Sequence, residues 1–196
     1  MRKLPKKAIF LDKDGTLIPN IPYNVDPERI ALNPEVGRSL KSLQDAGFLI
    51  VVITNQSGIA RDFYSEKNLI PIEKKLKKLL VDFNVNLSGF YYCPHHPLGT
   101  IPYNIVCECR KPKPGLLFRA ARNLYIDLSS SWMIGDTWSD IGAGFNAGCF
   151  TVLLSPYPNT MTPESKFTPD FKAKNFSEAA SIILETQEIL VNTSKL

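Results

Sequence analysis

The sequence lacks the long hydrophobic run that a membrane-spanning helix needs. Crossing a bilayer takes about 20 mostly apolar residues in succession, and no stretch of the chain approaches that length. A secretory signal is not expected either. Its apolar core has about 7 to 15 residues, whereas only residues 8–11 separate the basic N-terminal segment from Asp12. We therefore expect a cytoplasmic protein without membrane contact.

The sequence also lacks a strong excess of either charge, an internal repeat and a low-complexity tract. Lysine and arginine together number 23 against 19 aspartates and glutamates, so the net charge at pH 7 is only +4. The lysines near the N-terminus and at residues 74–78 have no aromatic residues between them, and such runs usually form solvated faces. We therefore expect no nucleic-acid partner.

What the chain does contain is an alternation of apolar runs and helical patterns. At 196 residues, 44% of them hydrophobic, it is long enough for one domain, residues 1–196, and no surplus apolar face suggests more than a monomer. The alternation predicts an α/β fold with a doubly wound, mostly parallel sheet. We expect strands at residues 8–11, 48–53, 90–92, 132–134 and 149–154, and helices at 34–46, 65–82, 114–124, 137–147 and from 175 onward.

Residues 8–16, Ala-Ile-Phe-Leu-Asp-Lys-Asp-Gly-Thr, form an apolar run that ends in two carboxylates and a glycine. Chemistry in a parallel sheet takes place just past the carboxyl ends of the strands. Two close carboxylates repel each other unless a cation lies between them, so Asp12 and Asp14 predict a Mg²⁺ site in which one aspartate can act as nucleophile. An ordinary Asp-Gly turn is the alternative. A Ca²⁺ loop is not expected, because it has glycine at its sixth position and Gly15 is fourth.

Two more predicted strands end in polar residues. Residues 54–58, Thr-Asn-Gln-Ser-Gly, offer a hydroxyl, an amide and backbone N–H groups that can cradle a phosphoryl group. Asp136 follows the fourth predicted strand and could complete a Mg²⁺ shell with Asp12, whereas Asp140 is either an outer anchor or a helix-cap residue. Because parallel strands end at the same edge of the sheet, we expect these groups to converge.

Four soft or borderline metal ligands lie within seventeen residues, in two pairs that are each separated by one residue. They are Cys93, His95, Cys107 and Cys109. Three cysteines and one histidine form a closed tetrahedral Zn²⁺ set, and thiols in the cytoplasm stay reduced, which argues against a disulfide. We therefore expect structural Zn²⁺ that orders a loop insertion at residues 93–109, with His96 as an alternative ligand. Cys149 is expected in the core.

The basic residues Arg110 and Lys111 follow directly after the last of these cysteines. Arginine offers a fork that can bind a phosphate through two hydrogen bonds, and lysine offers a point charge. A solvated basic run is the alternative reading. A metal that fixed Cys109 would also fix its two neighbours, which favours an anion site.

The motifs carry a resemblance to a known superfamily. Asp12-Lys13-Asp14-Gly15-Thr16, then Thr54, then Lys111, then Gly135-Asp136-x-x-x-Asp140 match, in this order, the four motifs of the haloacid dehalogenase superfamily of phosphatases. More narrowly, the chain resembles the D-glycero-D-manno-heptose 1,7-bisphosphate phosphatase family between residue 8 and about residue 155. The runs that carry this likeness are residues 54–61 (TNQSGIAR), 92–97 (YCPHHP), 107–112 (CECRKP) and 114–115 (PG).

The resemblance implies a Rossmann-like fold and a Mg²⁺-dependent phosphatase that forms an aspartyl-phosphate. Asp12 would be the nucleophile and Asp14 the general acid and base, while Thr54 and Lys111 would stabilise the phosphoryl group. Mg²⁺ would be held by Asp12, the backbone carbonyl of Asp14, and Asp136. The implied substrate is a small phosphorylated sugar of heptose biosynthesis, for lipopolysaccharide or another glycoconjugate. The implied substrate-binding residues are Asn20, Ile21, Pro22, Tyr23, Asn55, Gln56, Ser57 and Arg110.

Two residues depart from the family pattern: Glu35 and Asp62 stand where the family usually has glycine. Three other functions stay open from the sequence. A histidinol-phosphate phosphatase would be similar in fold, zinc loop and catalytic motifs. A signalling domain phosphorylated on Asp12 without turnover would leave Asp14 and the zinc loop without a role. A zinc-dependent nucleic-acid module would need a broader basic face than the chain offers.

Overall fold

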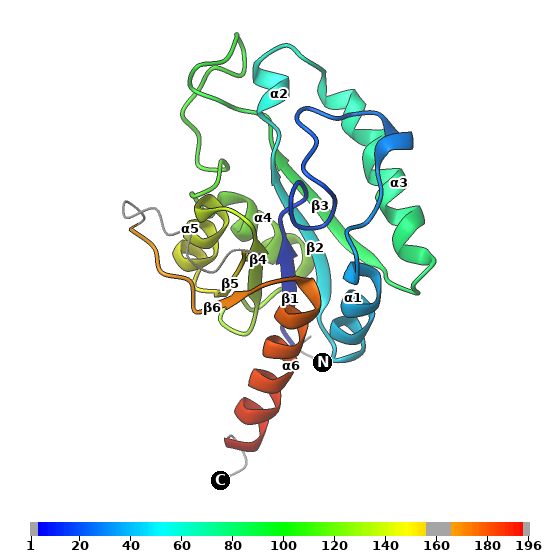
Figure 1. Ribbon diagram of the computed structural model, residues 1–196. Coiled ribbons are helices and arrows are strands. Elements are labelled where there is room, and N and C mark those ends of the chain that lie inside the picture. The colour runs from blue at the N-terminus through cyan, green and yellow to red at the C-terminus, as the bar shows by residue number, and fades with distance from the viewer. Residues whose placement is uncertain (1–3, 156–165, 194–196) are drawn as a thin grey trace.

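The computed structural model describes residues 4–155 and 166–193 and shows a parallel β-sheet between two layers of helices (Figure 1). Within these residues the sheet has six strands in the order β3-β2-β1-β4-β5-β6. The strands are β1 (Ala8–Leu11), β2 (Leu49–Asn55), β3 (Leu87–Cys93), β4 (Trp132–Gly135), β5 (Phe150–Leu154) and β6 (Phe171–Ala173). The predicted doubly wound parallel sheet is therefore confirmed.

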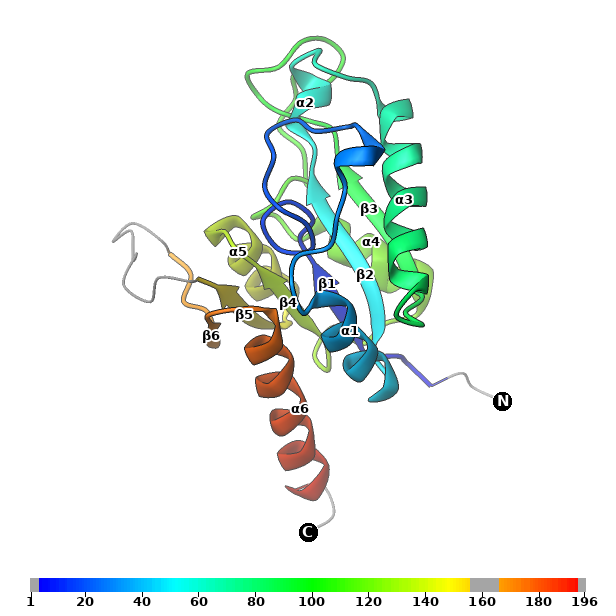
Figure 2. The same ribbon diagram turned by 45° about the vertical axis from the view of Figure 1, so that its right-hand side comes forward.

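The helices divide between the two faces of this sheet (Figure 2). One face is covered by α1 (Val36–Asp45), α3 (Leu69–Val81) and α6 (Phe176–Thr193), and the other by α4 (Gly115–Leu124) and α5 (Trp138–Ala147). The shorter elements are α2 (Ser57–Ala60) and two 3₁₀ turns, Pro27–Arg29 and Glu66–Asn68. None of the helices in the described residues is long and apolar enough to span a membrane.

The two-sided cover explains why β1 is apolar at every position. Successive side chains of a strand point to opposite faces of the sheet. Ile9 and Leu11 pack with α1, α3 and α6, whereas Ala8 and Phe10 pack with α4 and α5. All four β1 side chains are fully buried, so a continuous apolar run is what this position in the sheet requires.

The order of the strands reverses next to β1. β1 pairs with β2 on one side and with β4 on the other, and the chain reaches β4 only after it has completed β2 and β3. Open α/β sheets bind ligands at such a reversal, beyond the carboxyl ends of the strands. Figure 1 shows the loop after β1, α2 and the loop after β3 at this end of the sheet. The fold therefore brings together the polar residues that follow β1, β2 and β4.

Four short elements were not predicted from the sequence: α2, β6 and the two 3₁₀ turns. The four residues of α2 span barely one turn, so no helical period can be read from them. In β6 the central Lys172 is exposed and only Ala173 is buried, so no apolar run marks the strand. The predicted helices at 34–46 and 65–82 begin later than expected, at Val36 and Leu69, because 3₁₀ and left-handed backbone precede them.

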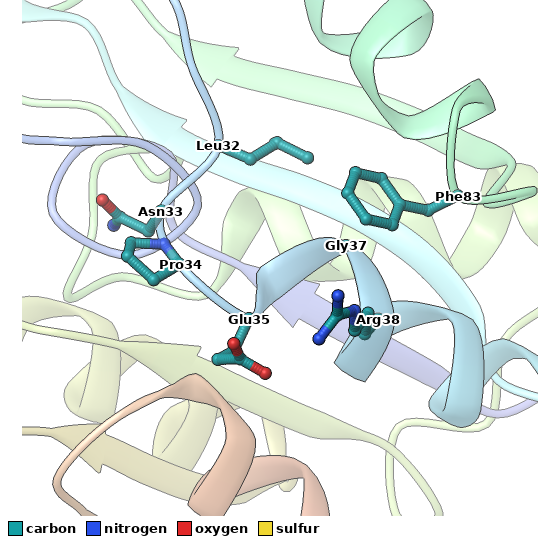
Figure 3. Close-up of a pocket in the computed structure, with 7 residues that line it drawn as sticks. All are labelled: Leu32, Asn33, Pro34, Glu35, Gly37, Arg38 and Phe83. Carbon is teal, nitrogen blue, oxygen red and sulfur yellow. The ribbon is translucent and has the colours of Figure 1, made fainter.

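Both residues that depart from the glycine pattern have left-handed backbone. Glu35 has φ 67° at the start of α1, and Asp62 has φ 57° just past α2. This conformation crowds the Cβ of an L-residue and costs roughly 1–2 kcal/mol, less for aspartate, whereas glycine adopts it freely. Figure 3 shows Glu35 at the first turn of α1, where the ring of Phe83 lies over Gly37. Glycine would therefore adopt the backbone at both positions without this cost.

Replacing Glu35 by glycine is expected to stabilise the protein. Relief of the left-handed strain outweighs the extra freedom of glycine in the unfolded chain, so the free energy of unfolding should rise by roughly 0.5 kcal/mol. Urea denaturation measures the change. Glu35→Ala is the matched control, because alanine removes the same carboxylate but keeps the strained Cβ. An equal gain in both variants would show that the side chain, and not the backbone, causes the effect.

Candidate functional site

A buried lysine lies between two carboxylates at the switch point of the sheet. Lys111, from the loop between β3 and α4, places Nζ 2.5 Å from Oδ1 of Asp12 and 2.5 Å from Oδ1 of Asp140. It also donates a hydrogen bond of 2.8 Å to the backbone carbonyl of Ile53 in β2. Only 3% of Lys111 is exposed. Groups from the end of β1, from β2, from the first turn of α5 and from one loop thus meet at a single ammonium group.

Burial and charge act in opposite directions on these groups. Burial raises the pKa of Asp12 to about 7, although the charge of Lys111 pulls it down. Burial alone would lower the pKa of Lys111, but the charges of Asp12 and Asp140 outweigh it and hold the pKa above its ordinary value. Lys111 is therefore a permanent cation next to a carboxylate that is costly to ionise.

Asp136 and Asp140 follow β4 and have different surroundings. Burial, and then the charge of Asp140, raise the pKa of Asp136 to about 6. Thr16 donates a hydrogen bond of 3.4 Å to its Oδ1. Asp140 accepts hydrogen bonds at Oδ2 from the backbone N–H (3.1 Å) and the hydroxyl (2.6 Å) of Thr137. Since its Oδ1 faces Lys111, Asp140 is both a helix-cap residue and an anchor, which combines the two predicted alternatives.

The chemistry of the donor set fits a hard divalent cation. Carboxylate oxygens of Asp12, Asp136 and Asp140 lie within 4.8 Å of one another, with a single lysine among them. Both oxygens of Asp140 are already engaged, which leaves Asp12 and Asp136 to face a cation. Gly15, with φ 92°, is required beside them, because a Cβ at this position would collide with the Asp136 carboxylate. Oxygen ligands of this kind suit Mg²⁺.

Asp14 is held between two side chains that donate to different oxygens. Lys13 Nζ lies 2.7 Å from Oδ1 of Asp14, and Gln56 Nε2 donates a hydrogen bond of 3.1 Å to Oδ2. The same Gln56 nitrogen donates to Thr54 Oγ1 at 2.8 Å, and Tyr64 donates to Gln56 Oε1 at 2.7 Å. The sequence predicted Asp14, Thr54 and Gln56 as site residues. It did not indicate Lys13, which is buried although lysines are usually exposed, or Tyr64, whose contact depends on the path of α2.

Asn55 fixes the backbone that carries the lysine. Its Oδ1 accepts a hydrogen bond of 3.1 Å from the backbone N–H of Lys111, and its Nδ2 donates one of 3.2 Å to the carbonyl of the same residue. The predicted substrate-binding role would have to share this amide with Lys111. Ser57, also predicted, is half-buried at the first position of α2.

The loop after β1 lies beside the segment that follows α2. Asn20, Pro22 and Tyr23 are exposed and Ile21 is half-buried. The Tyr23 ring packs edge-on against Phe63, with the ring centres 4.5 Å apart. The structure thus places the predicted substrate loop beside the segment that follows α2.

Four predicted metal ligands form a compact cluster after β3. Cys93 Sγ lies 3.5 Å from Cys107 Sγ and 3.2 Å from Cys109 Sγ, and His95 Nδ1 lies 3.3 Å from Cys109 Sγ. Hydrogen bonds from Cys93, Cys107 and His95 lower the pKa of Cys109 to about 5 and so favour its thiolate. All four cysteines of the chain are free thiols. The donor set fits a tetrahedral metal ion, and the histidine in it is His95.

His96 belongs to a different group. Its Nδ1 accepts a hydrogen bond from the backbone N–H of Leu98, and its Nε2 lies 3.5 Å from an Nη atom of Arg61. Burial, and then the positive charges of Arg110 and Arg61, lower the pKa of His96. Arg110 also donates a hydrogen bond of 3.3 Å to the backbone carbonyl of His95. Two guanidinium groups therefore meet beside the metal cluster.

The hollow drawn in Figure 3 lies apart from these residues. It has a volume of about 280 Å³ and is lined by the start of α1 and Phe83. None of the predicted site residues lines it. The functional chemistry of the chain therefore gathers at the carboxyl ends of the strands and not in this hollow.

Comparison with known proteins points to one family. Residues 108–179 match the family model described as HAD-hydrolase-like. The D-glycero-beta-D-manno-heptose-1,7-bisphosphate 7-phosphatase of Haemophilus ducreyi is 41% identical over 166 residues, which cover 84% of this chain and 91% of the relative. The protein of the same name from Escherichia coli K12 is 36% identical over 182 residues, or 92% and 95% of the two chains.

A solved structure agrees with these relatives. It is the D,D-heptose 1,7-bisphosphate phosphatase of B. bronchiseptica in complex with magnesium and phosphate. Its TM-score to this chain is 0.75 and its sequence identity is 27%, over 92% of this chain and 99% of the other. The fold predicted from the motifs is thus the fold of a solved protein that binds magnesium and phosphate.

Replacing Lys111 by methionine is expected to destabilise the protein strongly. The variant keeps the length of the side chain but leaves Asp12 and Asp140 buried without their cation, which should lower the free energy of unfolding by about 3 kcal/mol. Urea denaturation in the presence of a chelator measures the loss. Lys113→Met is the control, because Lys113 pairs with Glu108 at 2.7 Å on the surface and should change stability by less than about 0.5 kcal/mol. Similar losses in both variants would contradict the role given to the buried ion pairs.

Proposed function

Because the chain belongs to the family of D-glycero-β-D-manno-heptose-1,7-bisphosphate 7-phosphatases within the HAD-like hydrolases, we propose that it removes the 7-phosphate from this sugar bisphosphate. The observation that carries the proposal is the convergence of Asp12, Asp14, Thr54 and Lys111 at the switch point of the sheet. Cleavage of a phosphate ester needs a nucleophile in line with the leaving group, positive charge near the phosphoryl oxygens and a proton for the leaving oxygen. These residues supply all three.

In the first step an Asp12 oxygen attacks the phosphorus and the bond between phosphorus and the sugar oxygen breaks. Asp14 gives its proton to the departing oxygen, so the sugar leaves as an alcohol and the phosphoryl group stays on Asp12. In the second step Asp14, now a carboxylate, takes a proton from water. The water oxygen attacks the phosphorus, the bond to Asp12 breaks, and inorganic phosphate leaves with Asp12 restored.

Lys111 and Thr54 would stabilise the negative charge of the phosphoryl group in both steps. Lys111 Nζ is fixed beside Asp12 by Asp140 and Ile53, and the Thr54 hydroxyl proton is free to donate, because its oxygen accepts from Gln56. A Mg²⁺ ion held by Asp12, Asp136 and the backbone carbonyl of Asp14 would add charge neutralisation at the transferring oxygens.

Substrate recognition is assigned to the groups around this centre. Arg110, with Arg61 and His96 beside it, offers a fork for the second phosphate of the sugar. Residues 20–23 and the polar groups of residues 55–57 would contact the sugar phosphate.

We also propose that the chain works in the cytoplasm as a monomer on this small substrate. Cysteines arranged as metal ligands, like Cys93, Cys107 and Cys109, are typical of a reducing compartment.

Zn²⁺ is proposed for the second metal site, and its role is structural. Three sulfurs and one nitrogen close a tetrahedral shell, so no position is left for substrate. Cys109 lies two residues before Lys111, and Arg110 lies between them. A metal in this cluster would therefore fix the backbone that delivers both basic side chains to the phosphoryl site.

Phosphate release from the sugar bisphosphate tests the reaction. One equivalent of phosphate should appear per sugar in the presence of Mg²⁺, and faster than from histidinol phosphate. Asp12→Asn removes the nucleophile and should slow release by roughly 10 000-fold. Asp45→Asn is the control, because Asp45 lies on α1 in an exposed pair with Lys41. Faster turnover of histidinol phosphate, or unchanged release by Asp12→Asn, would reject the proposal.

Zinc content tests the second site independently of activity. Elemental analysis of the purified protein should find about one zinc per chain, because the four ligands close a single shell. Cys107→Ala should lose most of this metal and melt at a lower temperature, since the metal-bound loop contributes to folding. Cys149→Ala, which removes a buried thiol outside the cluster, should keep its zinc. Equal zinc content in the two variants would exclude this cluster as the site.

A further inference from the structure

A chain of hydrogen bonds connects the proposed proton carrier to a tyrosine that the mechanism does not use. Tyr64 donates a hydrogen bond of 2.7 Å to Oε1 of Gln56. Nε2 of the same amide donates to Oδ2 of Asp14 at 3.1 Å and to Oγ1 of Thr54 at 2.8 Å. The side-chain N–H groups of Gln56 thus donate to Asp14 and Thr54, two of the residues proposed to take part in phosphoryl transfer.

The local backbone holds both ends of this chain. Gln56 directly precedes α2, is 4% exposed, and its backbone N–H donates a hydrogen bond of 2.8 Å to the carbonyl of Cys93. Tyr64 follows α2 and its ring lies against Gly58, where any Cβ would collide with the ring. The backbone N–H of Phe63 donates to the carbonyl of Gly58 at 2.9 Å. The short helix therefore brings together two side chains that are eight residues apart in the sequence.

The orientation of the Gln56 amide has a chemical consequence. The two ends of an amide have nearly the same shape, but one donates and the other accepts. An ionised Asp14 needs a donor, so an inverted amide would place an acceptor against its Oδ2, whereas the Thr54 hydroxyl can donate or accept and tolerates either orientation. The Tyr64 hydroxyl donates to Oε1 at the opposite end, so the amide is held at both ends with Nε2 towards Asp14. Lys13 holds the other oxygen of Asp14.

We propose that Tyr64 is a positioning residue of the phosphatase reaction: it fixes the Gln56 amide and thereby aims the Asp14 carboxyl at the leaving oxygen. The inference rests on the proposed function, because it takes the proton-carrier role of Asp14 from there. With Nε2 against Oδ2, the amide remains a donor to Asp14 in both of its protonation states. The proton that Asp14 carries is then given to the leaving oxygen and not to Gln56.

Substrates with different leaving groups test this role in Tyr64→Phe, which keeps the ring and removes only the hydroxyl. Loss of a fixed hydrogen bond beside a charged group should lower kcat/KM for the sugar bisphosphate by roughly 10- to 100-fold, mainly through kcat. The departing nitrophenolate of para-nitrophenyl phosphate needs no proton, so its kcat/KM should fall less than about threefold. Tyr125→Phe is the matched control, because Tyr125 is half-exposed at the end of α4 and far from the carboxylates.

Equal losses with both substrates would overturn the proposal, because a merely structural defect does not depend on the leaving group. Unchanged turnover of the sugar bisphosphate would overturn it as well. The proposed function is judged separately, from turnover by the wild-type protein and its loss in Asp12→Asn.

A double-mutant comparison tests whether Tyr64 acts through Gln56. In a Gln56→Ala background the amide is absent, so Tyr64→Phe should cause no further loss, within about twofold. Additive losses would show that Tyr64 acts by another route and would reject the proposal.

Gln56→Glu gives a second check if Tyr64→Phe does not fold. It replaces the donor by an acceptor and should show the same selective loss with the sugar substrate, whereas a loss that is equal for both substrates would contradict the inference.

Discussion

The buried ammonium of Lys111 is the interaction on which the site depends. An unpaired lysine in this position would cost several kcal/mol in desolvation, and so would the carboxylates around it. Each charge is tolerable only because the others are present: Asp12 and Asp140 keep Lys111 ionised, and Lys111 opposes the effect of burial on Asp12. The elements that carry these three side chains must therefore be positioned accurately relative to one another, so that both ion pairs of Lys111 can form.

The fold positions the three side chains from β1, from α5 and from the loop between β3 and α4. β1 and β4 are neighbours in a parallel sheet, so Asp12 after β1 and Asp140 in α5, the helix that follows β4, lie at the same edge of the sheet. The third element is a loop, and Lys111 needs its own supports. The amide of Asn55 holds its backbone from β2, and the Cys/His cluster lies immediately before it in the chain. These contacts hold a loop that has little apolar content of its own.

Much of this arrangement could be predicted from the sequence, because buried strands leave continuous apolar runs and parallel strands share an edge. Asp12, Thr54 and Asp136 follow such runs, and the spacing of the cysteines gave the metal cluster without knowledge of the fold. Lys13 and Tyr64 could not be predicted in the same way. A lysine in a turn looks solvated until its ion pair with Asp14 is seen, and Tyr64 reaches Gln56 only through the four residues of α2. Contacts made by short, irregular elements leave no period in the sequence.

The two carboxylate oxygens of Asp140 have different structural roles. One oxygen holds the lysine and the other closes the first turn of α5. Glutamate would displace one of these contacts, asparagine would lose the charge, and serine would keep only the cap. The side chain at position 140 is therefore coupled to the one at position 111, since a change that releases the lysine also alters the start of α5, and a change of the cap also alters the charge beside the lysine.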